Sequence, residues 1–230
     1  ILYFPNFYLY IGKANKNFYK KYGWEKKFIK FSYTVDNKFL KVQSKKQDLE
    51  RAEVDRNKIY FYFVGKLIKR KNPILILKAI NLIKKEFSVA HFNFIGDGEE
   101  KTNLEKYIKK RGLTNISFLG FKSTSEIPKI INNFDVMICP SLQENWGLVV
   151  NESLALGKKV IVSSSVNSYE DLINNSNGMV FSNNDEYQLA RSMLHFIKNK
   201  KQMIDDNITT IDSSYTFKEN IKNILNISKL

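Results

Sequence analysis

Short apolar runs alternate regularly with segments of helical length between residues 58 and 200, and no other feature of the sequence constrains the fold as strongly. The apolar runs are near-continuous, which is typical of strands covered on both faces. We expect strands at 58–65, 91–96, 115–120, 135–140, 159–164 and 178–181. We expect helices at 72–87, 99–112, 123–134, 146–157, 168–175 and 185–200. This order predicts an α/β fold with a Rossmann-like, doubly wound parallel sheet.

The rest of the chain has a weaker pattern. Residues 1–50 are aromatic and basic and show no clear periodicity, whereas residues 207–230 are expected to end in a helix. A break is expected near Pro128 in the short helix of 123–134. Ligands of doubly wound sheets bind beyond the carboxyl ends of the strands, in the loops that lead into helices. Those loops are 65–72, 96–98, 120–125 and 140–147.

The first of these loops is strongly basic. Within VGKLIKRKNP, Gly65 allows a close turn, and it is followed by a group of cations. The cations are Lys66, Lys69, Arg70 and Lys71. Positive charge at the carboxyl edge of the sheet would suit a diphosphate. The alternative is an ordinary run of solvated charge.

The second loop reads IGDGEEKTNL and carries Gly96 and Gly98. The dinucleotide-binding fingerprint requires a third glycine, and Lys101 stands in its place, which argues against a nicotinamide-dependent dehydrogenase. The two glycines are then expected to allow close backbone approach to a ligand. A simple turn between strand and helix is an equally good interpretation.

Two glutamates lie eight positions apart in the stretch SLQENWGLVVNESLALG. Glu152 shares an apolar helix face with Leu148 and Val149, where a carboxylate is costly unless it meets hydrogen-bond donors. The adjacent hydroxyls of a ribose would supply them. The backbone from Gly147 to Val149 begins the helix and could bind a phosphate. In the alternative, Glu152 pairs with a lysine at the edge of the core and Glu144 is merely solvated.

Taken in order, the loops and strands resemble glycosyltransferase family 4 (group 1), whose members have the GT-B fold. The matching segments are GKLIKRK (65–71), GDG (96–98), FLG (118–120), DVMICPS (135–141), ENWGLVVNE (144–152) and GKKVI (157–161). The resemblance covers about residues 58–200, the carboxyl-terminal half that binds the sugar donor. It therefore implies the GT-B carboxyl-terminal domain.

The resemblance also implies a domain organisation. The sequence begins with Ile1, and we expect it to be a fragment of a two-domain protein. Residues 1–50 would be the tail of the amino-terminal domain and the linker, and residues 51–205 the donor-binding domain. Residues 206–230 would form a helix that returns toward the missing amino-terminal domain.

By resemblance, Lys66 stands where an arginine usually binds the diphosphate, and Lys71 matches the phosphate-binding lysine. Glu144 would contact the donor sugar and Glu152 the ribose, while Trp146 replaces a commoner phenylalanine. The expected catalytic residues are Glu144, Lys71 and Lys66. The expected donor-binding residues are Gly65, Gly96, Gly98, Phe121, Lys122, Asn145, Trp146, Gly147, Leu148, Val149 and Glu152. In this set Phe121 and Lys122 would meet the base.

The implied reaction is the transfer of a sugar from a UDP- or GDP-linked donor to an acceptor hydroxyl, with retention of configuration. No Asp-x-Asp sequence is present, so no metal and no cofactor besides the donor substrate are expected. The acceptor would be a glycan or a lipid-linked molecule in polysaccharide or glycolipid synthesis. The alternatives are a nucleotide-sugar-binding module that is inactive without its acceptor domain, and a GT-B nucleotide-sugar epimerase.

The net charge of +14 comes almost entirely from scattered lysines. It fits peripheral contact with an anionic membrane, or simply a biased composition. We expect no nucleic-acid partner, because no recognised binding motif accompanies the charge. We expect a cytoplasmic protein, at the inner face of the membrane where the acceptor is lipid-linked.

Composition supports a folded domain. Hydrophobic residues make up 43% of the chain, and the longest apolar stretches are too short to cross a bilayer. No signal peptide is visible at the start. The single cysteine, Cys139, is expected in the core of a protein from a reducing compartment. His91 and His195 are expected to be structural.

Overall fold

A computed structural model describes residues 7–24, 27–45, 55, 57–200 and 215–227 of the 230-residue chain. Its centre is a parallel sheet of six strands in the order β5-β4-β3-β6-β7-β8. The strands are β3 (Ile59–Val64), β4 (Ala90–Ile95), β5 (Ile116–Phe118), β6 (Val136–Cys139), β7 (Lys159–Ser163) and β8 (Gly178–Phe181). The chain winds outward from β3 to β5 and then returns beside β3 as β6. The doubly wound sheet predicted from the sequence is confirmed, with its switch point between β3 and β6.

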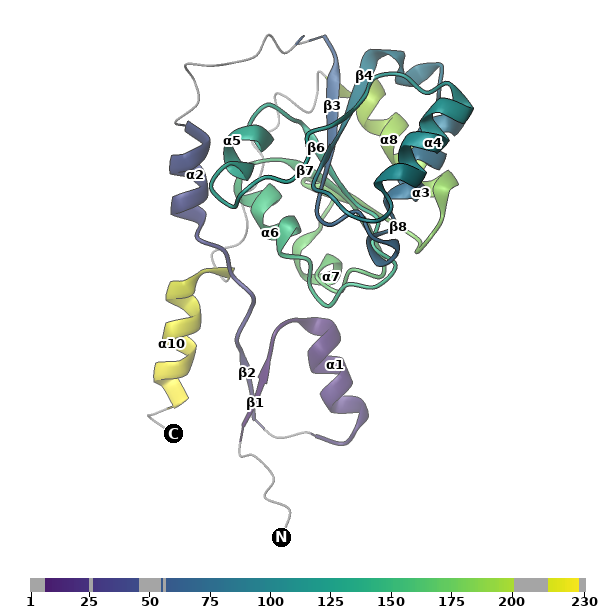
Figure 1. The fold of residues 1–230 in the computed structure, drawn as a ribbon. Coiled ribbons are helices and arrows are strands. Elements are labelled where there is room, and N and C mark those ends of the chain that lie inside the picture. The colour runs from purple at the N-terminus through teal and green to yellow at the C-terminus, as the bar shows by residue number, and fades with distance from the viewer. Residues whose placement is uncertain (1–6, 25–26, 46–54, 56, 201–214, 228–230) are drawn as a thin grey trace.

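Helices cover both faces of the sheet (Figure 1). The helices are α3 (Pro73–Leu82), α4 (Lys101–Arg111), α5 (Ile127–Ile131), α6 (Leu148–Ala155), α7 (Tyr169–Leu172) and α8 (Glu186–Lys198). Two short 3-10 helices join them, at Lys69–Lys71 and Glu86–Val89. One hydrophobic cluster lies between the sheet and α3, α4 and α8, and the second lies between the sheet and α5, α6 and α7.

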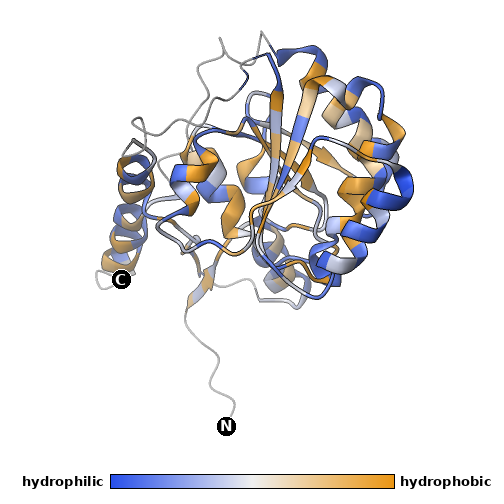
Figure 2. Ribbon diagram, turned by 45° about the horizontal axis from the view of Figure 1, so that its top comes forward, coloured by the Kyte–Doolittle hydropathy of each residue, from blue (hydrophilic) through white to orange (hydrophobic). Residues whose placement is uncertain are grey.

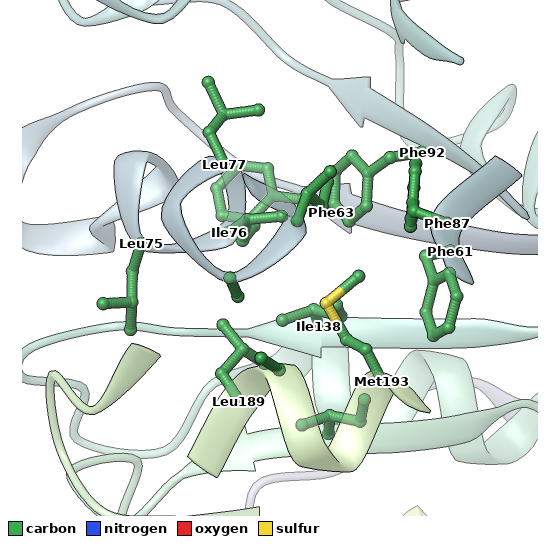
Figure 3. Close-up of a cluster of buried hydrophobic side chains, with 14 of the residues drawn as sticks. Phe61, Phe63, Leu75, Ile76, Leu77, Phe87, Phe92, Ile138, Leu189 and Met193 are labelled. Atoms are coloured by element: carbon green, nitrogen blue, oxygen red, sulfur yellow. The ribbon is translucent and has the colours of Figure 1, made fainter. Parts of the chain in front are cut away.

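Strand β3 contributes side chains to both clusters because successive side chains of a strand point to opposite faces of the sheet. Phe61 and Phe63 belong to the first cluster, together with Leu189 and Met193 of α8 (Figure 3). Tyr62 belongs to the second cluster and is fully buried. Burial on both faces explains the unbroken apolar sequence of this central strand.

Several predicted helix limits are wrong. The helix expected at 72–87 ends at Leu82, and Asn72 precedes it in a left-handed conformation with a φ of 52°. Pro128 does not break a helix, because α5 begins at Ile127 and Pro128 lies in its first turn. Proline is tolerated there because the first N–H groups of a helix have no intrahelical partner.

The amino-terminal residues form elements that the sequence pattern does not reveal. Strands β1 (Phe7–Tyr10) and β2 (Lys27–Lys30) pair in parallel and flank α1 (Lys13–Lys21), and α2 (Asn37–Lys45) follows. Helix α1 has no fully buried residue, and its mostly polar and basic sequence gives only a short apolar face, with Ala14 and Tyr19 partly buried.

The last helix, α10 (Phe217–Ile227), lies beside β2 (Figure 1). The amide of Asn220 accepts from the backbone N–H of Ser32 at 3.1 Å and donates to its carbonyl at 2.8 Å. Asn223 donates to the carbonyl of Lys30 at 3.0 Å. Apolar and polar residues both appear along this helix (Figure 2). The predicted domain limits near residues 50 and 205 lie outside the described residues.

Candidate nucleotide-sugar site

The loop after β3 and the loop after β6 meet at the switch point of the sheet. The N–H of Leu142 donates to the carbonyl of Arg70 at 2.9 Å, and Nη1 of Arg70 donates to the carbonyl of Gln143 at 2.9 Å. The loop after β8 joins them, since Asn183 donates to the carbonyl of Leu142 at 3.4 Å. Three loops that are distant in sequence therefore form one bonded wall at the carboxyl edge.

The carboxylate of Glu144 is held within this wall. It forms an ion pair with Nζ of Lys71, and Nη1 of Arg70 lies 3.3 Å from the same oxygen. The side chains of Glu144 and Lys71 are only 15% and 19% exposed. The alternative in which Glu144 is merely solvated is wrong, because two cations from the loop after β3 hold it in place.

The basic loop divides into two parts. Lys71 contacts Glu144 as described, whereas Lys66 is exposed and forms no ion pair with the described residues. Arg70 was not among the predicted site residues, although the dense charge of this loop was a signal for it. Its guanidinium is half-exposed, so part of it still faces solvent.

The glycines of the first two loops allow these loops to approach each other. An added Cβ on Gly96 would lie 1.9 Å from the carbonyl oxygen of Gly65, and one on Gly98 would lie 2.5 Å from that of Leu67. Leu67 also donates to the carbonyl of Asp97 at 2.9 Å. The glycines therefore allow close backbone approach, but in this structure the loop after β3 approaches the loop after β4 and not a ligand. A contact of Gly65, Gly96 or Gly98 with a donor remains a prediction.

Gly147 sets the start of helix α6. Its φ is 80°, a left-handed value that side chains disfavour, and an added Cβ would lie 3.1 Å from Val166 and 3.3 Å from Cγ of Glu144. Gly147 gives no side-chain cap, and the first N–H groups of a helix have no partner within it. The N–H groups of Leu148 and Val149 thus begin a helix next to the Glu144 carboxylate.

Glu152 has the opposite environment from Glu144. Its carboxylate makes no hydrogen bond or ion pair with the residues that the structure describes, so the predicted pairing with a lysine is not found there. Burial raises the pKa of Glu152 above its ordinary value. The most buried residues of α6 are Val150 and Leu154, whereas on the face of Glu152 only Val149 and Leu156 pack partly against the core, Leu148 is exposed and Glu152 is half-buried.

Trp146 is almost fully buried, with 3% of its surface exposed. Its Nε1 donates to Oδ1 of Asn151 at 2.7 Å, and its ring centre lies 6.1 Å from that of Tyr33 and 6.1 Å from that of Tyr215. An added Cβ on Gly12 would meet the same ring at 2.5 Å. Trp146 therefore joins the amino- and carboxyl-terminal segments to the sheet domain, a role that its predicted donor contact does not capture.

The remaining predicted residues lie further out. Phe121 is exposed and Lys122 is partly exposed, and no hydrogen bond links either of them to the two glutamates in the described part of the chain. Asn145 is exposed beside Glu144.

Neither histidine belongs to the site. Nε2 of His91 lies 2.9 Å from Oγ of Ser117 on the neighbouring strand, and burial and nearby Lys58 lower the pKa of His91. His195 contacts Asn199 one turn along α8. Both histidines therefore have the structural surroundings expected for them.

Among the described residues, no three histidine, cysteine, aspartate or glutamate side chains gather closely enough to hold a metal ion. Within the same residues, no helix is both long enough and apolar enough to span a bilayer.

A doubly wound parallel sheet with an acidic and basic site at its switch point defines a ligand-binding α/β domain of the nucleotide-binding class. The comparisons are more specific. The family model described as "Glycosyl transferases group 1" matches residues 44–208. The chain belongs to this family, so the predicted membership of group 1 is confirmed. Membership of glycosyltransferase family 4 in particular remains a prediction.

Two curated relatives illustrate the membership. An uncharacterized glycosyltransferase of Methanocaldococcus jannaschii is 30% identical over 139 residues, which cover 60% of this chain and 38% of the relative. The UDP-Gal:alpha-D-GlcNAc-diphosphoundecaprenol alpha-1,3-galactosyltransferase of Escherichia coli is 31% identical over 184 residues, 76% of this chain and 43% of that protein. The chain thus spans less than half the length of these relatives.

A solved structure supports the fold. The crystal structure of Anabaena HepE in complex with UDP and glucose superposes with a TM-score of 0.75 at 19% identity. The match covers 99% of this chain and 64% of that chain, so it includes the terminal segments as well as the sheet domain. The GT-B assignment of the fold is therefore confirmed.

Proposed function

We propose that this chain holds the donor site of an enzyme that transfers a sugar from a nucleotide diphosphate to an acceptor hydroxyl. The observation that carries the proposal is Glu152, a half-buried carboxylate without a partner among the described residues. It lies on α6, about 6 Å along the axis from Leu148 at the helix start. A ligand that bridges the helix start and Glu152 would satisfy both.

The ribose of the donor fits Glu152. Two adjacent hydroxyls donate hydrogen bonds, and a carboxylate has several free acceptor positions. Hydrogen bonds to a charged acceptor are stronger than neutral ones, and they would offset the burial that raises the pKa of Glu152. Phe121 and Lys122 would meet the base at the far end of the nucleotide.

The diphosphate fits the start of α6. The N–H groups of Leu148 and Val149 and the partial positive charge of the helix end favour an anion. Lys71 and the exposed Lys66 would add charge that stabilises the departing nucleoside diphosphate. These groups support a metal-independent departure of the leaving group.

The donor sugar would then reach Glu144, whose side chain Lys71 and Arg70 hold in place. In the proposed step the acceptor oxygen bonds to the anomeric carbon on the face from which the diphosphate leaves, so configuration is retained. The bond from that carbon to the phosphate oxygen breaks, and the hydroxyl proton passes to the leaving diphosphate. Glu144 positions the sugar in this step.

Relatives suggest the substrates. The Escherichia coli relative is named for a UDP-Gal donor and a diphosphoundecaprenol-linked acceptor, and HepE was crystallised with UDP. We extend these properties to this chain as a UDP-linked donor, with GDP as the alternative base, and a lipid-linked or glycan acceptor. The same proposal includes a cytoplasmic location and peripheral contact with the inner face of the membrane. The net charge of +14 would favour contact with anionic lipids.

Calorimetric titration of the chain with UDP, GDP and ADP tests the proposal. One nucleotide is expected to bind, and Glu152→Ala is expected to weaken it by roughly ten- to a hundredfold, because a charged acceptor is lost. Glu105→Ala is the matched control, an exposed glutamate on α4. Equal behaviour of the two variants, or no binding to the folded chain, would contradict the donor site.

Binding without transfer is the second candidate. It is favoured by the single six-stranded sheet in which the candidate donor site lies among the described residues, because enzymes that close two lobes on a substrate need both lobes for transfer. Release of UDP from UDP-galactose in the presence of an acceptor glycoside separates the two candidates. The anomeric proton signal of the first product formed reports retention or inversion.

A further inference from the structure

A second hollow lies beside the proposed donor site. A cavity of about 390 Å³ opens between the first turns of α1 and the residues that follow Glu144. Asn167 lines it, and the N–H of Asn167 donates to the carbonyl of Glu144 at 3.1 Å. Asn145, the next residue after Glu144, lines it as well. The cavity therefore adjoins the backbone of Glu144, the residue at which the donor sugar is proposed to lie.

The polar side chains of the cavity are three amides, from Asn15, Asn145 and Asn167, together with the phenol of Tyr33. Oδ1 of Asn15 accepts from the N–H of Ile11 at 3.1 Å, which leaves its Nδ2 without a partner among the described residues. The side chains of Asn145 and Asn167 likewise make no hydrogen bond within the described part of the chain. An amide offers both donors and an acceptor, which matches a hydroxyl group.

The apolar part of the lining is largely aromatic. Phe18 is 52% exposed and Tyr33 is 44% exposed, and the almost fully buried Trp146 also lines the cavity. Aromatic rings offer flat apolar surface, against which the C–H face of a pyranose can pack. Free amides together with exposed rings are suited to a sugar.

Charge is absent from the described lining of the cavity. The neighbouring cation is Lys13, whose Nζ donates to the carbonyl of Glu170 at 2.7 Å. The neighbouring anion is Asp171, whose Oδ2 accepts from the N–H of Lys13 at 2.8 Å. Both groups are engaged with the protein, so the described lining offers no charged side chain to pair with a phosphate or a carboxylate.

We propose that this cavity binds a neutral sugar ring of the acceptor, the ring that presents the attacked hydroxyl. The inference rests on the proposed function and adds the class of the acceptor's reactive end. A volume of about 390 Å³ lies at the small end of ligand sites, which span ~300–1,000 Å³, so it suits a ring rather than a chain of several sugars. Phosphates of a lipid carrier would then lie outside the cavity.

Saturation-transfer NMR on the 230-residue chain tests the proposal, with and without UDP. The neutral probes are methyl α-D-glucopyranoside, methyl α-D-galactopyranoside and methyl N-acetyl-α-D-glucosaminide, and the charged probe is glucose 1-phosphate. At least one neutral glycoside is expected to bind more strongly than the phosphate. A stronger signal from glucose 1-phosphate, or none from any neutral glycoside while UDP binds, overturns the inference.

Variants locate the binding. Asn167→Ala and Phe18→Ala are each expected to weaken the glycoside about fivefold, as loss of one hydrogen bond or one ring contact does, and to leave the UDP affinity unchanged. Asn103→Ala on α4 and Tyr187→Ala on α8 are the matched controls, since both residues are exposed elsewhere. Unchanged glycoside binding in the two cavity variants overturns the inference. Loss of UDP binding in Glu152→Ala reports separately on the donor site.

Discussion

Glu144 and Glu152 lie eight residues apart on one loop and helix, and their carboxylates have opposite surroundings. Glu144 is paired with Lys71 and Arg70 and is fixed before any ligand arrives. Glu152 is half-buried without a partner in the described structure, and burial raises its pKa. The difference suggests a division of labour, in which one carboxylate is preorganised for the reacting sugar and the other is satisfied only when the nucleotide binds.

The largest expected effect follows from removal of the paired carboxylate. Glu144→Gln is expected to lower the rate of sugar transfer by roughly 10²–10³-fold, because a preorganised charge near the reacting carbon is lost. The nucleotide affinity should change little, since Glu152 and the start of α6 are intact. Rates and calorimetric Kd values of Glu144→Gln, with Glu105→Gln as control, check this. A loss confined to nucleotide affinity would show that the two glutamates share one role.

The contrast between the glutamates was only partly predictable. The alternation of strands and helices gave the strands of the sheet to within one or two residues, because burial on both faces leaves a local apolar pattern. The pattern around Glu144 and Glu152 also predicted a helix that contains Glu152, and α6 confirms this helix from Leu148 to Ala155. Local pattern cannot show which carboxylate is paired, because the cations come from a loop more than seventy residues earlier.

Other features could not be predicted from the sequence for the same reason. Both faces of α6 are apolar in sequence, and only packing against the sheet decides that Val150 and Leu154 are core residues. Helix α1 was not predicted because it is short and mostly polar and basic, and one of its contacts is with the distant Asp171, which accepts a hydrogen bond from the N–H of Lys13. The burial of Trp146 against Tyr215 likewise depends on a segment about seventy residues away.

A smaller effect should come from the residue that clamps the two loops. Arg70→Gln removes the bonds to the carbonyl of Gln143 and to Glu144. It is expected to weaken UDP-glucose about fivefold relative to UDP, since a net loss of about 1 kcal/mol falls on the sugar side of the site. Calorimetry with both ligands measures the ratio. Arg70→Lys should restore part of the affinity for UDP-glucose relative to UDP, and Lys69→Gln should leave this ratio of affinities unchanged. An equal loss of affinity for both ligands in Arg70→Gln would argue against a positioning role for Arg70.

The smallest effect concerns the unpaired carboxylate in the free protein. Because burial raises the pKa of Glu152, the folded chain binds this proton more tightly than the unfolded chain. The free energy of unfolding therefore falls as the pH rises from the unfolded pKa of the carboxyl through its folded pKa. Glu152→Gln removes this loss, so it should raise the Tm at pH 7.5 by about 2–4 °C, or about 1 kcal/mol.

Measuring the Tm difference between the two chains at two pH values, with and without UDP, makes this last prediction specific to Glu152. At pH 4 the Tm difference should shrink, because the carboxyl is then largely protonated in both states. Saturating UDP should reverse it at pH 7.5, because only the unaltered chain gains hydrogen bonds from the ribose to a carboxylate. A Glu152→Gln chain that is less stable at every pH would mean that the carboxylate has a partner within the protein. Glu152 would then be preorganised like Glu144, and the nucleotide would have to be bound by other groups.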